Sequence, residues 1–317
     1  MKKICFCLFL PLITWAQNTT EQVTLLLEKK DYKAANELIV PYVKNNPDNL
    51  KALELLGDTY SFQTNWDAAI EAYKKLTILD NTQANFFYKY GGAMGMKALD
   101  ANKVNALLLI DDIKEAFLKA AELDPKHIDV RWALVELYIQ LPGILGGSVK
   151  KALVYASELE NISKVDGYLA KGTIYESDKN FNLAESYYKK AVAIGGSITC
   201  YDALSEFYDK QKQPEKAIET IEISNKKHPR NAVNYQIGKV AATYNIQLEK
   251  GINCLKKYLA NYSVTDGVPK AWAYYRLAQI YKHQKQKQEA LKYINMAVAA
   301  LPDIAEFKKE RQLVLKL

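Results

Sequence analysis

Histidine is scarce in this sequence, and the motifs of common catalytic sites are missing. Its three histidines, His127, His228 and His283, stand far apart and lack the short spacing of a metal site. We interpret them as solvent-exposed residues at turns or helix ends. The Gly-x-Ser-x-Gly pattern of a nucleophile elbow does not occur either. We therefore predict no metal, no cofactor and no enzymatic activity.

The sequence also has little net charge and no low-complexity segment. Its 43 Lys and Arg residues stand against 36 Asp and Glu residues, a formal net charge of +7 over 317 residues. A surface that binds nucleic acid needs many basic side chains clustered on one face. We therefore expect no nucleic-acid partner, and we expect no disordered linker between parts of the chain.

Long apolar runs are absent as well, apart from a short one near the start. Lys2 and Lys3 precede the apolar residues 4–15, and the small residue Ala16 follows. This order is typical of a secretory signal peptide, residues 1–16, that is cut after Ala16. The run is too short to span a bilayer comfortably, which takes about 20 residues, although an uncleaved anchor is the alternative. We predict a periplasmic or secreted protein of the bacterial envelope, with no membrane span after cleavage.

Cysteine is equally rare. Cys5 and Cys7 fall inside the predicted signal peptide, so the mature chain would keep only Cys200 and Cys254. An exported pair of cysteines could form a disulfide. We favour two buried thiols, because both residues fall on predicted helices that are not neighbours and a disulfide tolerates little misplacement.

What the sequence does contain is an internal repeat. Gly91 follows Gly57 by 34 residues, and Ala217 follows Ala184 by 33. Within each copy, small and bulky residues stand three and four apart, which places them on one face of a helix. Two helices that approach closely need this alternation in order to interdigitate. The same pattern recurs at Gly172 and Tyr188, Ser205 and Ile221, Gly238 and Leu255, and Ala278 and Ile294.

The pattern resembles the tetratricopeptide repeat, a helix-turn-helix unit of 34 residues. The resemblance implies an all-α fold, a right-handed superhelical solenoid of about eight repeats over residues 17–303. Residues 304–317 are interpreted as an amphipathic helix that caps the last repeat, whose outer face has no neighbour. Single copies depart from the family pattern, as at Ile113, which stands where Ala is usual. We place the repeats at residues 21–48, 50–82, 83–126, 127–164, 165–197, 198–230, 231–262 and 267–303.

Two copies are stretched by insertions. The third copy has extra residues at about 97–108, and the fourth carries the loop 141–147. Insertions in repeat arrays form surface loops, which often carry function. The loop runs into Gly-Gly-Ser-Val-Lys-Lys, which fails the phosphate-loop pattern because no Lys follows the last glycine directly. We expect Ser148 to cap the helix that starts at Val149, with an anion at that helix start as the alternative.

In the family that the sequence resembles, the first helix of each repeat lines a concave groove, and the helix period assigns the inward residues. The resemblance implies a groove with aromatic ends and an acidic middle, which would favour a partner that carries Lys or Arg. For Trp132 and Trp272 the alternative is packing against the next repeat. The predicted ligand groove comprises Tyr88, Trp132, Glu136, Glu176, Asp202, Glu206, Asp209, Tyr235, Trp272 and Tyr275, with Met96 beyond Tyr88.

These features together predict an extracytoplasmic scaffold that binds a protein or an extended peptide. The alternative is an accessory protein of cell-envelope assembly or polysaccharide handling, in which the aromatic groove residues stack on sugars. Some relatives hold a C-terminal carboxylate with a clamp of Lys, Asn and Arg, but this sequence has Glu54 and Asp58 among the groove positions. The pattern leaves the partner's identity and the oligomeric state open.

Overall fold

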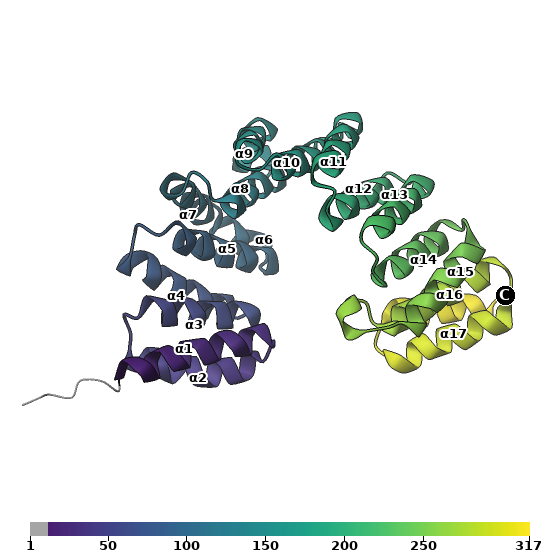
Figure 1. Ribbon diagram of the computed structural model, residues 1–317, viewed down its shortest axis with the longest axis horizontal. Helices are drawn as coiled ribbons and strands as arrows, with labels where there is room; N and C mark the ends of the chain where they lie inside the picture. The colour runs from purple at the N-terminus through teal and green to yellow at the C-terminus, as the bar shows by residue number, and fades with distance from the viewer. Residues whose placement is uncertain (1–11) are drawn as a thin grey trace, which may run out of the picture. The chain divides into compact units, whose positions relative to one another are not determined.

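The fold consists of helices joined by short connections (Figure 1). The computed structural model describes the backbone of residues 12–317 and the side chains from residue 19 onward. Over these residues it contains α-helices and two short 3-10 turns but no strand, which confirms the predicted all-α class. The predicted signal peptide lies outside the described residues, except that its last residues begin α1 (Leu12–Glu28). No helix in this described stretch is both long and apolar enough to cross a membrane.

The helices form two compact units, Met1–Ala170 and Lys171–Leu317. In the first unit consecutive helices pack as antiparallel pairs, and α6 (Lys103–Leu107) and a 3-10 turn (Gly143–Leu145) are additions to this scheme. The pairs are α1 with α2 (Tyr32–Asn45), α3 (Leu50–Phe62) with α4 (Trp66–Leu79), α5 (Ala84–Asp100) with α7 (Ile110–Leu123), and α8 (Ile128–Gln140) with α9 (Val149–Ile162).

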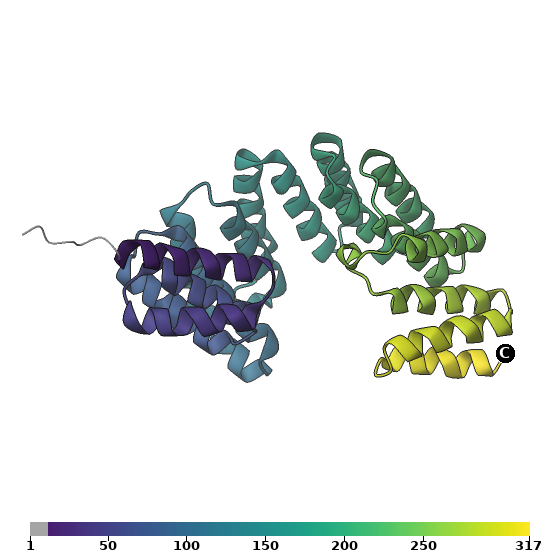
Figure 2. The ribbon, with the colours of Figure 1, turned by 60° about the horizontal axis from the view of Figure 1, so that its bottom comes forward.

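The second unit repeats the same pairing, and a final helix, α18 (Ala305–Leu315), packs on its last pair (Figure 2). Its first helix, α10 (Lys164–Ser177), begins in the first unit. The pairs are α10 with α11 (Phe181–Gly195), α12 (Ile198–Lys210) with α13 (Pro214–Lys227), α14 (Ala232–Tyr244) with α15 (Leu248–Ala260), and α16 (Lys270–His283) with α17 (Lys287–Ala300). A 3-10 turn (Val264–Asp266) precedes α16.

A glycine on the first helix of a pair makes room for a ring on the second. A Cβ atom at Gly57 would lie 2.4 Å from the ring of Tyr73, and one at Gly172 would lie 2.7 Å from that of Tyr188. The Tyr73 hydroxyl then donates a hydrogen bond of 2.7 Å back to Asp58 on the first helix. Burial, helped by that carboxylate, raises the pKa of Tyr73 above its ordinary value, so the hydroxyl stays a donor at neutral pH. The recurring small residue is therefore required by packing.

The small residues of the second helices are buried in the same way. Ala69, Ala184 and Ala290, on α4, α11 and α17, are each 0% exposed, which confirms that they hold equivalent interior places. Ile113 fills the alanine position of α7 and is also buried. These positions lie between helices with no spare volume, since protein interiors are close-packed.

The turn inside a repeat has a recurring backbone geometry. Thr64 and Lys179 both adopt left-handed conformations, with φ of 56° and 60°. The next residue caps the second helix, so that Asn65 accepts a hydrogen bond from the Ala68 amide. Left-handed φ is strained for a residue with a β-branched side chain. The turn therefore stores strain at Thr64 that a glycine would relieve.

Three smaller expectations have mixed outcomes. Ser148 caps α9 as predicted, accepting a hydrogen bond of 3.2 Å from the Lys151 amide. Cys200 is a buried free thiol, whereas Cys254 is free but only half-buried. The interpretation of the histidines as solvent-exposed was wrong for His127 and His228, which are both half-buried. The His127 ring lies 5.2 Å from the Tyr88 ring, and His228 Nε2 lies 2.7 Å from the Gly196 carbonyl oxygen.

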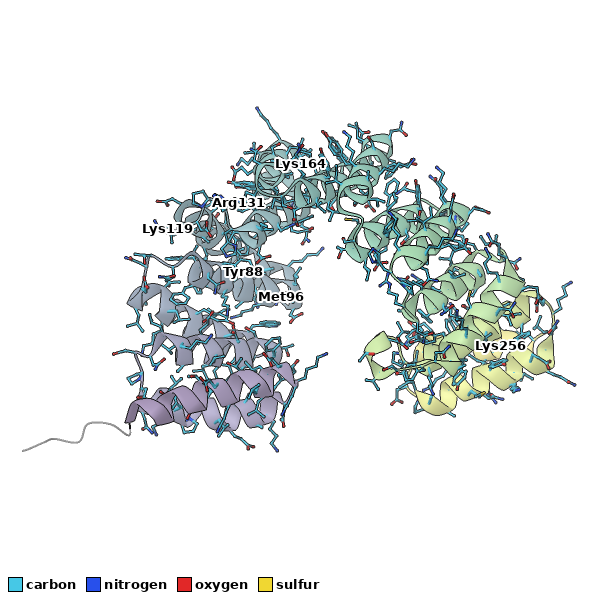
Figure 3. The ribbon with its side chains drawn as sticks, in the orientation of Figure 1. Tyr88, Met96, Lys119, Arg131, Lys164 and Lys256 are labelled. Atoms are coloured by element: carbon cyan, nitrogen blue, oxygen red, sulfur yellow. The ribbon has the colours of Figure 1, made fainter. Side chains whose placement is uncertain are left out.

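One buried charge fixes the junction of α7 and α8. Arg131, 3% exposed and labelled in Figure 3, lies on α8 beneath the end of α7. Its guanidinium donates to the carbonyl oxygens of Asp124, at 2.7 Å, and Ala121, at 3.2 Å. Its Nε also pairs with Glu158 at 3.2 Å. The carbonyl groups at the end of α7 would otherwise lack partners, so this arginine holds the two helices together.

Candidate ligand-binding site

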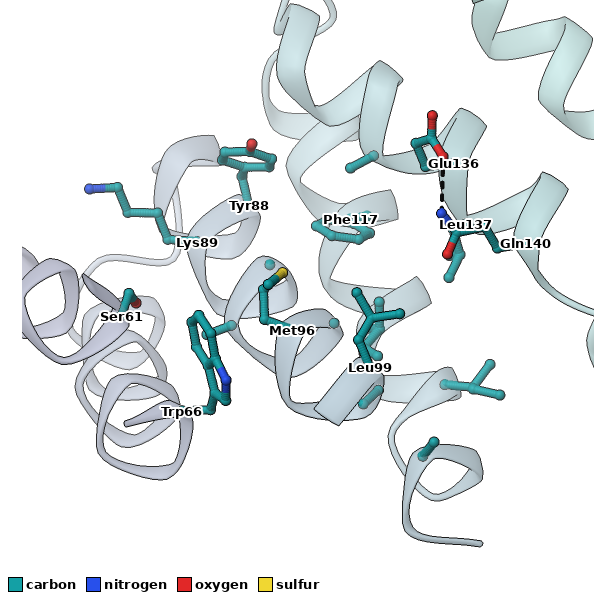
Figure 4. Close-up of a pocket in the computed structure, with 18 of the residues that line it drawn as sticks. Ser61, Trp66, Tyr88, Lys89, Met96, Leu99, Phe117, Glu136, Leu137 and Gln140 are labelled. Carbon is teal, nitrogen blue, oxygen red and sulfur yellow. Dashed lines mark hydrogen bonds between the residues drawn. The ribbon is translucent and has the colours of Figure 1, made fainter. Parts of the chain in front are cut away.

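A pocket of about 620 Å³ lies in the first unit, beside α5 (Figure 4). Its walls are mostly apolar side chains from α4, α5, α7 and α8. Figure 4 shows Met96 and Leu99 of α5 between Trp66 on one side and Leu137 on the other. A concave, mainly apolar pocket of this size is the usual form of a ligand site.

The α5 side of the pocket is hollow because two of its residues lack side chains. Gly92, Gly95, Met96 and Leu99 follow one another at helical spacing and all line the pocket. A Cβ atom at Gly92 or Gly95 would meet no atom within 4 Å apart from its own neighbours and the nearby backbone of α5. Gly91 next to them differs, since a Cβ there would lie 2.9 Å from the Phe117 ring. The helix thus packs through Gly91 and leaves its Gly92 face uncovered.

The opposite side of the pocket comes from α8 and has the same spacing. Ala133, Glu136, Leu137 and Gln140 line it. The Glu136 carboxylate accepts a hydrogen bond of 3.0 Å from the Gln140 amide, drawn in Figure 4. Residues Ile110, Ile113 and Phe117 of α7 line the pocket between α5 and α8. Two helical faces therefore border one apolar surface.

The two insertions of the first unit meet at this pocket. Leu99 and Ala106 line it from the insertion at 97–108, and Leu141 lines it from the loop 141–147. Two of the apolar side chains at this place are largely exposed to solvent, Leu99 at 68% and Met96 at 44%. Exposed apolar residues that adjoin one another mark interaction sites more often than isolated ones do. The insertions thus enlarge an apolar surface instead of closing it.

The cations at the border of the pocket are already engaged. Lys89 pairs with Glu54 and with Asp58, both at 2.7 Å, and Lys97 pairs with Asp67. Burial alone would raise the pKa of Glu54, but the hydrogen bond and charge of Lys89 hold it below its usual value. These lysines therefore have little charge left to offer a ligand.

Two carboxylates near the pocket have polar partners but no cation. Glu136 has only Gln140, and Asp100 accepts a hydrogen bond of 2.7 Å from the indole of Trp66. Neither carboxylate forms an ion pair within the described part of the chain. The electrostatic balance at the pocket therefore favours a cationic group on a ligand.

The predicted groove residues of the first unit divide between the pocket and the packed interior. Tyr88 and Glu136 line the pocket, as does Met96. The Tyr88 ring is half-buried against Phe117, with 6.2 Å between ring centroids. Trp132 is not among the lining residues, and its indole donates a hydrogen bond of 3.0 Å to Asp166.

The predicted acidic residues of the second unit are mostly paired. Glu176 lies 3.0 Å from Lys210, Asp202 lies 2.5 Å from Arg230, and Asp209 lies 3.4 Å from Lys239. In each pair the base belongs to the first helix of the next repeat or to the turn before it. Glu206, by contrast, is exposed. Because three of the four acids are neutralised in this way, this face has less negative charge than the sequence indicates.

The predicted aromatic residues of the second unit pack on one another. Tyr235 is 9% exposed and lies 5.6 Å from the Tyr258 ring. Trp272 meets the edge of Phe307 at 4.8 Å, and Tyr275 stacks on the same ring at 5.0 Å. Trp272 thus follows the packing alternative. The polysaccharide-handling alternative stays a prediction, which a glycan array with Trp132→Ala and Trp272→Ala would test.

The residues that make the pocket hollow were not predicted. Gly92 and Gly95 carry no chemistry of their own, so a search for charged and aromatic groove residues passes over them. Two non-packing glycines inside one helix, beside an insertion, are the signal that could have found them, because glycine in a helix interior is destabilising by about 0.5–1 kcal/mol. Such a cost requires a reason other than folding.

Comparisons with known proteins agree with this architecture. Sequence models described as tetratricopeptide repeat match residues 20–84, 165–194 and 273–302. No curated protein sequence matches the chain. Among solved structures, a tetratricopeptide repeat protein from Parabacteroides merdae ATCC 43184 is 14% identical, with a TM-score of 0.53 over 95% of this chain and 98% of its own.

Two further solved structures are similar over different lengths. A chain of the APC/C hetero-tetramer Cut9-Hcn1 is 14% identical with a TM-score of 0.50, over 93% of this chain but 55% of its own. YrrB, described as a TPR protein with an unusual peptide-binding site, is 17% identical with a TM-score of 0.44, over 64% of this chain and 98% of its own. At 14% identity, the likeness to the Cut9-Hcn1 chain shows the fold alone.

Proposed function

We propose, from the premise that the chain belongs to the tetratricopeptide repeat family, that it works as an interaction scaffold outside the cytoplasm. Proteins of this family are typically non-enzymatic scaffolds for protein partners. We propose that the partner binds in the pocket of the first unit, and that the protein resides in the bacterial envelope or outside the cell.

The observation that carries this proposal is the meeting of both insertions at one apolar pocket. Leu99, Ala106 and Leu141 would not be needed for a repeat of ordinary length, yet all three line it. Interfaces draw most of their affinity from a few large side chains that fill pockets at their centre. A pocket of about 620 Å³ offers such a place to an apolar anchor of a partner.

The partner would carry a basic group. From the sequence, a basic partner is expected because of the acidic groove residues of the second unit. In the structure, however, such acids are paired, as Asp202 is with Arg230, and little negative charge is left on that face. In the first unit, Glu136 can attract a basic group of the partner, because it lines the pocket and has only the Gln140 amide as its partner. An apolar anchor next to a Lys or Arg would match both the walls and the carboxylate.

The extracytoplasmic location has its own test. Lys2, Lys3 and the apolar residues 4–15 motivate it. In cells that produce the full chain, we expect the mature protein to begin at Gln17 and to appear in the periplasmic or secreted fraction. Amino-terminal sequencing and fractionation measure both. Recovery of the uncut chain in the cytoplasm would contradict the location but leave the pocket untouched.

Capture of partners by matched variants tests the pocket. Gly92→Leu places a side chain in the hollow and fits the helix, because a Cβ there meets nothing within 4 Å. Gln288→Leu adds the same side chain to an exposed site on α17 and is the control. We expect the wild type and the control to retain the same proteins from an envelope fraction, and Gly92→Leu to lose them. Equal capture by all three would contradict the proposal.

A further inference from the structure

The space between α5 and α8 has the form of a missing helix neighbour. We call it the trough, and define it by Gly92, Gly95, Met96 and Leu99 on α5 and by Ala133, Glu136, Leu137 and Gln140 on α8. Each set follows the helical spacing of three, four and seven residues. α5 and α8 make little direct contact with each other, and the apolar space between them is lined from both sides.

A helix fits this trough better than an extended chain does. An extended peptide needs partners for its backbone amide and carbonyl groups, and burying these groups unpaired is costly. The surrounding pocket offers few such partners, because its Lys89, Tyr73 and Trp66 already direct their polar atoms at carboxylates. A helix satisfies its own backbone and presents only side chains.

The glycines give a helix room to approach. With no side chain at Gly92 or Gly95, the backbone of α5 is open on that face. Packed helices lie about 8–10 Å apart, and small residues at the contact allow the shorter distances. Apolar side chains of the incoming helix would then lie against Met96, Leu99 and Leu137, which line the same space.

The geometry points to one occupant, and we propose that an amphipathic helix of the partner binds in the trough, with a Lys or Arg beside its apolar face pairing with Glu136. The proposal rests on the proposed function and specifies the partner's conformation and charge. Glu136 has only an amide as its partner, and the neighbouring lysines are taken up by Glu54, Asp58 and Asp67. The incoming helix thus needs apolar residues three and four apart and one basic residue within a turn of them.

Selection from a random peptide library tests this partner chemistry. The full chain is the bait, and Gly92→Leu serves for counter-selection. The enriched peptides are then synthesised, and their affinities are measured by fluorescence anisotropy and their helicity by circular dichroism. We expect helical spacing of apolar residues, one Lys or Arg, and a gain of helix on binding.

The variants separate the parts of the proposal. Gly92→Leu should weaken a selected peptide by about ten-fold or more, because the added side chain would overpack the filled contact. Gln288→Leu should leave its affinity unchanged. Glu136→Lys should weaken it by about five-fold, and exchanging the peptide's Lys for Glu should restore most of that loss. No restoration by this charge exchange would overturn the role of Glu136.

The remaining outcomes distinguish this proposal from the proposed function. Selected peptides that need the pocket but contain proline or bind in an extended form would overturn the helix and leave the scaffold standing. If every selected peptide binds Gly92→Leu as well as the wild type, but Gly92→Leu no longer captures envelope proteins, only the proposal of a bound helix is contradicted. If neither peptides nor envelope proteins depend on the pocket, both proposals fall.

Discussion

α5 in the first unit and α12 in the second are each the first helix of a repeat, and they differ at matched positions. Counted from the repeated small residue, Gly92 and Gly95 of α5 correspond to Glu206 and Asp209 of α12. In the second unit Asp209 reaches Lys239 in the next repeat, at 3.4 Å. In the first unit the two glycines reach nothing and border a pocket of about 620 Å³. We call the face of α12 that carries Asp209 the closed face, because an ion pair joins it to the next repeat, and the face of α5 that carries Gly92 and Gly95 the open face.

The difference shows which residues the fold depends on. Gly57 and Gly172 hold the same packed position in the two units, each against a tyrosine of the second helix. The fold is therefore set by the small and bulky residues between helices, which both units share. The inner positions of the first helices contribute less to folding, so they are free to differ between an open and a closed face.

The largest expected effect contrasts a packed position with an open one. Ala184 is fully buried on α11, so Ala184→Glu should bury an unpaired charge and lower the free energy of unfolding by on the order of 4 kcal/mol. Gly92→Glu adds the same carboxylate to the trough and should change it by less than about 1 kcal/mol. Denaturant unfolding followed by circular dichroism measures both. An unchanged stability of Ala184→Glu would mean that the assigned packing is wrong.

Two neighbouring glycines sharpen the contrast within one helix. Gly91→Ala should destabilise by about 1–3 kcal/mol, because its Cβ would meet the Phe117 ring at 2.9 Å. Gly92→Ala should stabilise by about 0.5–1 kcal/mol, because alanine favours the helix and the site is open. Thermal melts of the two variants against the wild type decide the sign. Stabilisation by both would show that α5 is looser than the pocket geometry requires.

The site could be predicted only in part from the sequence. The helix period predicted that Tyr88 and Glu136 lie on the inner face, and both line the pocket. The pairing of Asp202 with Arg230 was missed because the residues are 28 apart in sequence and the period of one helix does not relate them. The pocket was missed because it depends on absent side chains and on the path of two insertions, neither of which is periodic. The fold was predictable because packing repeats the same small residues.

Removing the lysines that pair with acids of the second unit should leave those acids free to attract a basic peptide. With Lys210→Gln and Lys239→Gln together, Glu176 and Asp209 lose their ion pairs. We expect a lysine-rich peptide to bind this double variant about five-fold more tightly than the wild type at low salt, and the difference to vanish at high salt. Fluorescence anisotropy measures it. Equal binding by both proteins would show that these acids were not neutralised by the lysines.

The smallest effect tests what the units share. Thr64 in the first unit and Lys179 in the second hold the same left-handed turn, with φ of 56° and 60°. Glycine at either position should raise the free energy of unfolding by about 0.5–1 kcal/mol, and more at Thr64 because its side chain is β-branched. Opposite signs in chemical denaturation would mean that the turns differ, and that the units differ in more than their inner faces.

Photo-crosslinking in the native envelope tests most directly the central claim, which is that the partner binds at the trough of the first unit. A crosslinking amino acid replaces Leu99, a trough residue that is 68% exposed, or Glu206, which is exposed on α12 of the second unit. In the native envelope we expect partner adducts from position 99, abolished when Gly92→Leu is added, and none from position 206. Adducts at position 206 that are absent at position 99 would place the partner on the second unit and contradict the account.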